Sequence, residues 1–223
     1  MINLAKLLTS ILFITTVNFT GCAYGQTVPV NSNSEQAISA IDLQINLRKL
    51  WDDQAVMTRN VMLCILDKLP GELPAIYSLV QNQDEIGEAL IPYFGKENSA
   101  EFTELLYAKV NFSVEVFKAA RLDSITTKQA FLKWHESSNK ISSFFKNYYS
   151  KGDANEVKLI LRNNIDLTFL QMQRHVNGDI DGDKIAYEKV RIGIQQYADR
   201  LSKGMIQQFP AKFIETKNRI VQN

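Results

Sequence analysis

The stretch that decides the fold lies at residues 47–65, LRKLWDDQAVMTRNVMLCI. It is the longest clean amphipathic segment of the chain, because one set of its residues recurs at alternating spacings of three and four. This spacing describes one stripe along an α-helix, and it predicts a helix buried against other helices. The stripe consists of Leu47, Leu50, Gln54, Met57, Val61 and Cys64.

One member of this stripe, Gln54, is polar among apolar neighbours. The amide is either a core residue, satisfied by hydrogen bonds or setting the register of the helix, or a group that lines an interior site. Two other long amphipathic segments repeat the pattern, with Lys109 inside the stripe of residues 99–120 and Asn164 inside that of residues 153–177. If the three positions lie at one level of a bundle, they converge.

Lys109 is the most informative of the three, because an unpaired ammonium inside a protein costs several kcal/mol. Its amine can extend to solvent, it can pair internally with Asp52, Asp166 or Asp183, or it can line a pocket for an anionic group. The candidate ligand-binding residues are Gln54, Lys109 and Asn164, with Arg48, Trp51 and Arg59 nearby.

The periodicity predicts an all-α protein, an antiparallel helical bundle of about four long helices plus two short ones. The short helices are expected at residues 74–80 and 84–92, separated by Asn82, Gln83 and Asp84. Residues 35–213 would form a single domain, followed by a frayed tail at residues 214–223. The net charge of +1 lacks the basic excess typical of nucleic-acid-binding proteins.

Residues 1–25 resemble a signal peptide, with Lys6 before an apolar run that is too short to span a bilayer. The sequence FTGC at residues 19–22 is similar to a lipobox, in which Cys22 would be acylated. Cleavage after residue 25 is the alternative, and residues 26–34 would form a tether. Both alternatives predict export to the periplasm, the membrane-anchored cell envelope or the extracellular space, with membrane contact through a lipid anchor at most.

The two cysteines of the chain fit this prediction. If Cys22 is acylated or removed, Cys64 stands alone and no internal disulfide can form. Cys64 lies on the apolar stripe, so we expect an inert buried thiol.

A second kind of site is suggested by residues 177–188, NGDIDGDKIAYE. Oxygen ligands occupy the first, third, fifth and twelfth places of a calcium loop, and glycine occupies the sixth. Lys184 argues against calcium, because an apolar residue normally packs at the eighth place. The candidate ligands are Asn177, Asp179, Asp181, Asp183 and Glu188.

The chain also resembles an uncharacterised family of exported or envelope-associated bacterial helical proteins. The resemblance covers about residues 47–213. It rests on LRKLW at 47–51, Thr58-Arg59, PYFG at 92–95, Trp134, NGD at 177–179, Tyr187 and GMIQQFPAKF at 204–213.

This resemblance implies histidines at the positions of Gln54, Lys109 and Asn164, where a metal or haem could bind between helices. Here all three residues differ, and an ammonium would repel a cation. The resemblance also implies a tight turn at Gly178 and a helix capped by Asp179, in place of a calcium loop.

We therefore expect an exported helical bundle that binds a small ligand or a protein partner without catalysis. It would carry a lipid anchor if Cys22 is acylated. The alternative is a metal-dependent or other enzyme that uses a polar site inside the bundle. No nucleotide-binding glycine loop or strained nucleophile motif is present, and the sequence predicts no cofactor.

Overall fold

The structure is a computed structural model that describes residues 39–213. The predicted signal peptide, the tether and the tail after residue 213 lie outside this range. Within it the chain forms six α-helices and a short 3-10 helix, η1, which confirms the all-α prediction. The elements are α1 (Ala40–Leu66), α2 (Glu72–Phe94), α3 (Lys96–Ala119), α4 (Ser124–Tyr148), α5 (Ala154–Val176), α6 (Ile180–Gln208) and η1 (Pro210–Lys212).

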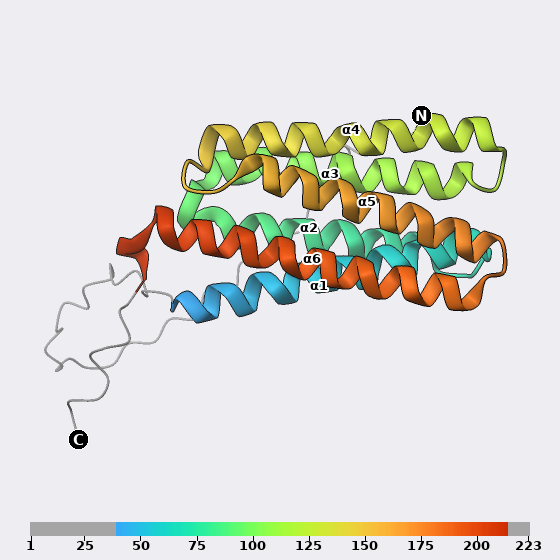
Figure 1. Ribbon diagram of the computed structural model, residues 1–223, viewed down its shortest axis with the longest axis horizontal. Helices are drawn as coiled ribbons and strands as arrows, with labels where there is room; N and C mark the ends of the chain where they lie inside the picture. Colours follow the sequence, from blue (N-terminus) through green and yellow to red (C-terminus); the bar gives the residue numbers. More distant parts are fainter. Residues whose placement is uncertain (1–38, 214–223) are drawn as a thin grey trace, which may run out of the picture. The chain divides into compact units, whose positions relative to one another are not determined.

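The helices form a bundle in which each one packs against the next along the chain, and α6 packs back against α1 (Figure 1). The predicted central helix is part of α1, which begins after its N-cap residue Ser39. The Ser39 hydroxyl accepts a hydrogen bond from the backbone N–H of Ile41. Because α1 contacts α2, α3 and α6, its stripe faces three other helices.

The two short helices predicted between residues 74 and 92 are a single helix, α2, of 23 residues. Asn82 and Gln83, which suggested a break, are fully buried. The Asn82 side chain donates to the Leu50 carbonyl on α1 at 3.1 Å, and the Gln83 amide donates to the Leu79 carbonyl at 2.7 Å. These contacts satisfy both buried amides. The bond from Asn82 to α1 is tertiary, and it offsets the weak helix propensity of asparagine. The prediction of four long and two short helices was wrong.

The core of the described residues consists of two apolar clusters with buried polar residues between them. Along α3 the first cluster ends at Leu106 and the second begins at Val110, with Lys109 between them. Along α5 the clusters change between Leu161 and Ile165, on either side of Asn164. The buried polar residues at this level are Gln54, Asn82, Gln83, Lys109, Ser137, Ser138 and Asn164. We call them the polar layer.

The connection between α2 and α3 is a single residue, Gly95, with φ of 81° and ψ of 164°. This backbone conformation is strained for any residue with a side chain. We expect Gly95→Ala to lower the free energy of unfolding by about 1–3 kcal/mol, measured by urea denaturation. The control Lys96→Ala should change it by less than about 0.5 kcal/mol, and equal losses in both variants would contradict the prediction.

Candidate functional site

The structure brings Gln54, Lys109 and Asn164 to one small cavity inside the bundle. The cavity has a volume of about 20 Å³, which is room for roughly one or two water molecules. Five helices contribute side chains to its wall. The lining residues are Gln54, Ala55, Thr58, Arg59, Lys109, Val110, Ser113, Trp134, Asn164, Thr168, Gln171, Val190 and Ile194.

Lys109 lies inside the bundle, with 7% of its surface exposed, so its amine does not extend into solvent. Among residues 39–213 its Nζ has one hydrogen-bond acceptor, Gln54 Oε1 at 3.2 Å, and no carboxylate partner. Burial lowers the pKa of Lys109 from its ordinary value of 10.5 to about 8. The amine is therefore protonated at neutral pH but poorly compensated.

The three aspartates considered as internal partners of Lys109 all bind other residues, so the structure does not form the internal ion pair that was one of the three alternatives for this lysine. Asp52 accepts two hydrogen bonds from the Arg191 guanidinium, at 2.6 and 2.8 Å. The other two aspartates also have basic partners. Asp166 lies 3.2 Å from the His135 ring, and Asp183 lies 2.6 Å from Arg59.

A chain of hydrogen bonds fixes the orientation of Gln54. Its Nε2 donates to Gln83 Oε1 on α2 at 2.6 Å, which leaves its Oε1 facing the Lys109 amine. Gln83 is anchored in turn by the bond to the Leu79 carbonyl. Gln54 is thus both a satisfied core amide and a lining residue, so the two interpretations from the sequence are compatible.

Asn164 also lines the cavity, and its side chain connects α5 to α6. Its side-chain Nδ2 donates to the backbone carbonyl of Val190 at 2.8 Å, and its backbone carbonyl accepts from the Thr168 hydroxyl at 2.8 Å. Since an amide nitrogen has two N–H groups, the bond to Val190 uses one of them. The other has no hydrogen-bond acceptor among residues 39–213.

Arg59 connects the cavity to a cluster of charged residues that the sequence analysis missed. Its guanidinium forms two hydrogen bonds with the buried Asp183 carboxylate, at 2.6 and 3.0 Å, and lies 4.5 Å from the centre of the Tyr187 ring. Gln171 also donates to Asp183, at 3.0 Å. Arg59 and Asp183 are 124 residues apart, so no local pattern could have paired them.

His175 joins this cluster and bridges three helical segments. Its Nδ1 lies 3.2 Å from Asp183 on α6, and its Nε2 lies 2.8 Å from Asp67 at the end of α1. Desolvation by burial lowers the pKa of His175, but the hydrogen bonds to Asp67 and Asp183 outweigh it, so the pKa is raised from 6.5.

Arg48 and Trp51 do not line the cavity. The Arg48 side chain is half exposed and forms hydrogen bonds with Asp199, at 2.5 and 2.7 Å. Trp51 is fully buried in the first apolar cluster, where its ring meets Tyr197 edge-on at 4.6 Å. Of the three residues expected nearby, only Arg59 belongs to the wall.

The proposed calcium loop folds as a turn and a capped helix. Gly178 has a φ of 72°, and the Asp179 carboxylate accepts from the Gly182 N–H at 2.9 Å at the start of α6. Asp183 points to Arg59 instead of sharing a ligand shell with Asn177, Asp181 or Glu188. Residues 39–213 contain no group of three or more His, Cys, Asp or Glu side chains that could hold a metal ion.

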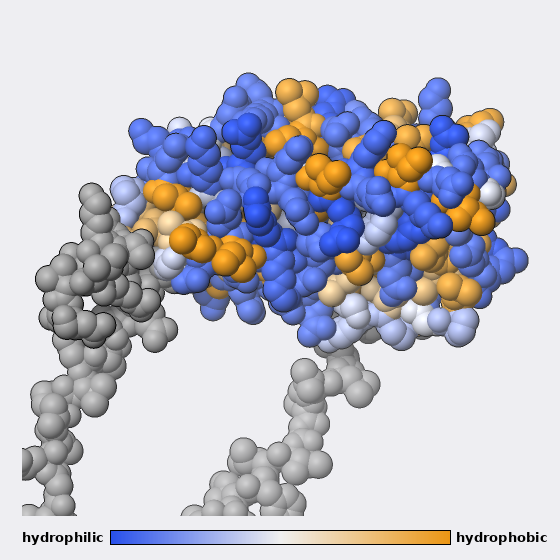
Figure 2. Space-filling view, turned by 60° about the horizontal axis from the view of Figure 1, so that its bottom comes forward, coloured by the Kyte–Doolittle hydropathy of each residue, from blue (hydrophilic) through white to orange (hydrophobic). Residues whose placement is uncertain are grey.

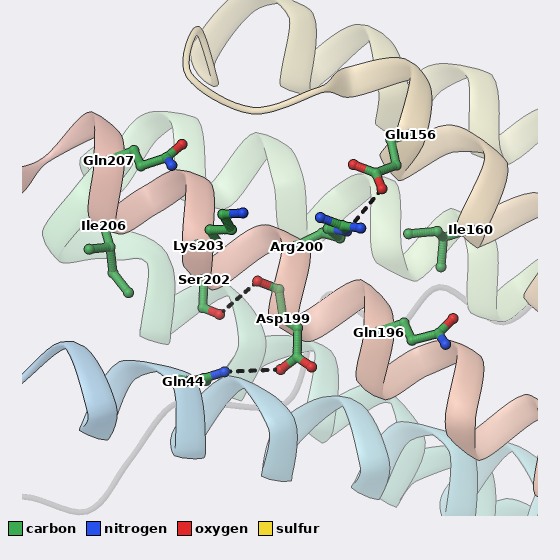
Figure 3. A pocket seen from close by; sticks show the side chains of 10 residues that line it. All are labelled: Gln44, Glu156, Ile160, Gln196, Asp199, Arg200, Ser202, Lys203, Ile206 and Gln207. Atoms are coloured by element: carbon green, nitrogen blue, oxygen red, sulfur yellow. Dashed lines mark hydrogen bonds and ion pairs between the residues drawn. The ribbon is translucent and has the colours of Figure 1, made fainter.

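A larger depression lies on the surface where α1, α5 and α6 meet, with a volume of about 720 Å³ (Figure 3). Two of its charged groups form an ion pair with each other, since Arg200 binds Glu156 at 2.9 Å. Asp199 pairs with Arg48 at 2.5 Å and also accepts from Gln44 at 3.3 Å. Figure 2 shows that hydrophobic residues on one face of the bundle form separate small groups among hydrophilic ones. Such scattered residues need no special explanation.

The chain matches no protein-family model, and comparisons with curated proteins and with solved structures find no match. The resemblance to an envelope-associated family therefore stays a prediction. None of the helices within residues 39–213 is long and apolar enough to cross a membrane.

The contacts of His175 predict a pH-dependent contribution to stability. Because its folded-state pKa lies above 6.5, the protonated ring stabilises the fold fully below pH 6.5, and this contribution is lost as the pH rises through the raised value. His175→Gln should therefore lower the free energy of unfolding by on the order of 1 kcal/mol at pH 5.5, and by less at pH 8.

Urea denaturation at the two pH values measures this difference. The control Lys184→Gln removes an exposed charge near the start of the neighbouring helix α6 and should have the same effect at both pH values. A loss in His175→Gln that is independent of pH would show that the ring acts only by packing.

Proposed function

We propose that the protein is an exported helical bundle that binds a small ligand in its interior cavity without catalysis. The observation that carries this proposal is the buried amine of Lys109, which borders the cavity and has no carboxylate partner among the described residues. Replacing such a group by an apolar residue is often neutral or stabilising, so folding alone gives little reason to place it there. A ligand that binds to the ammonium group of Lys109 would explain why a lysine is buried there.

The bundle suits this role because it holds the wall of the cavity rigidly. We infer that successive helices run antiparallel, since a single residue joins α2 to α3 and the other connections are similarly short. Side chains from five helices then meet at the level of the polar layer. The small volume of the cavity favours a compact ligand over a haem, a lipid or a peptide.

Export is the second part of the proposal and rests on the sequence of residues 1–25. Acylation of Cys22 would attach the bundle to a membrane surface, and cleavage after residue 25 would release it. Either product carries the same interior cavity. A protein partner would bind elsewhere, and the depression beside α1, α5 and α6 is one surface that could receive it.

An enzyme that uses the same interior site is the second candidate. It is favoured by the pKa of Lys109, about 8, because an amine that loses its proton near neutral pH can act as a base or nucleophile. Any substrate would need to be as small as the cavity.

The proposal predicts that the protein isolated from its native membrane or envelope fraction carries a small bound molecule. Native mass spectrometry of the full-length chain should show an adduct of a few heavy atoms on the wild type. Lys109→Met should lose the adduct, because it removes the group that contacts the ligand. The same spectra report whether Cys22 is acylated or the chain is cleaved after residue 25.

The matched control is Lys203→Met, which removes a lysine of the surface depression and should keep the adduct. An adduct that persists in Lys109→Met and disappears in Lys203→Met would move the site to the surface. A wild-type protein that carries no adduct in any preparation would contradict binding in the cavity.

A further inference from the structure

The charge balance of the cavity is unusual. Two basic residues, Lys109 on α3 and Arg59 on α1, belong to its wall, and the lining residues of α4, α5 and α6 are uncharged. No residue of α2 lines the cavity. The charge of Arg59 is balanced by Asp183, and His175 lies on the far side of Asp183. Among the described residues, the charge of Lys109 is left uncompensated.

An uncompensated ammonium in a protein interior has two ways to lower its free energy. It can lose its proton, and burial moves the pKa of Lys109 in that direction, to about 8. It can also acquire a counterion. Below pH 8 the amine keeps its proton, so the second route is the one open at neutral pH.

The volume of the cavity limits the size of a counterion, and the polar groups of its wall determine how the counterion can be bound. The volume of about 20 Å³ excludes phosphate, sulfate and larger organic acids. An ammonium has three N–H donors, and the bond to Gln54 uses one of them. Asn164, with a side-chain amide, and Thr58, with a hydroxyl, also belong to the wall.

We propose that the cavity binds a monovalent anion of about one to three heavy atoms, such as a halide or formate, against the Lys109 ammonium. This inference rests on the proposed function and assigns the ligand class of the same site. A single negative charge neutralises the one uncompensated positive charge, whereas a metal cation would be repelled by Lys109 and Arg59.

Binding of such an anion is coupled to a proton. The anion stabilises the ammonium, so the complex keeps its proton to a higher pH than the free protein does. Above pH 8 the free protein must take up a proton when the anion binds. The affinity should therefore fall about tenfold for each further pH unit, until the complex itself begins to lose its proton.

The test measures thermal unfolding of the full chain in sodium gluconate, whose anion is too large for the cavity. Sodium chloride, bromide or formate replaces gluconate at constant ionic strength. A ligand that binds the folded state raises the melting temperature progressively with its concentration. We expect this rise in the wild type at pH 7 and a much smaller one at pH 9.5. Sodium sulfate serves as the size control.

Two variants separate specific binding from general salt effects, which act on all proteins alike. Lys109→Met removes the cation. Gln54→Glu places a carboxylate next to the amine, because Gln54 Oε1 already lies 3.2 Å from Nζ, and keeps the size of the side chain. Both variants should lose the excess response of the wild type to the small anions, whereas neither should change the response to sulfate.

Equal responses of all three proteins to chloride, bromide and formate would overturn the anion assignment. So would a wild-type response that is as large at pH 9.5 as at pH 7. In either case, an adduct in native mass spectrometry that depends on Lys109 would still support a ligand of another class. If the wild type shows neither the anion-dependent rise in melting temperature nor an adduct, the proposed function is contradicted as well.

Discussion

The central constraint on this structure is the burial of an ammonium group in the middle of a helical bundle. Lys109 lies between two apolar clusters, at the level where buried polar side chains interrupt the core of α1 to α5. Such a group destabilises the fold unless its environment compensates its charge. Here one amide oxygen faces it, and its side chain borders a small cavity.

The hydrogen bonds of the polar layer position this amine and connect the helices. Gln54 and Gln83 link α3 to α1 and α2, and Asn164 links α5 to α6. Arg59, which also lines the cavity, forms an ion pair with Asp183. His175 contacts the same aspartate. The cavity therefore lies beside a titratable cluster. A change of pH can alter the bundle and the site together, through different groups at different pH values.

The sequence predicted the class of fold and three of the lining residues for one physical reason. A polar residue in an apolar helical stripe must face the interior, so the positions of Gln54, Lys109 and Asn164 could be recognised from spacing alone. Features that depend on contacts between distant parts of the chain could not be predicted from the sequence. Asn82 and Gln83 resembled a helix break because their partners, including Leu50 on another helix, cannot be read from the sequence. The ion pair of Arg59 with Asp183 was hidden for the same reason.

The most direct test of this account is the titration of Lys109 itself. Nuclear magnetic resonance of the lysine side-chain amines, in a buffer of large anions and with Lys109→Met to assign the signal, measures its pKa in the ligand-free protein. The account predicts a value near 8, because the buried ammonium lacks a counterion. A value at or above the ordinary 10.5 would contradict it, since the amine would then be solvated or paired with an internal carboxylate.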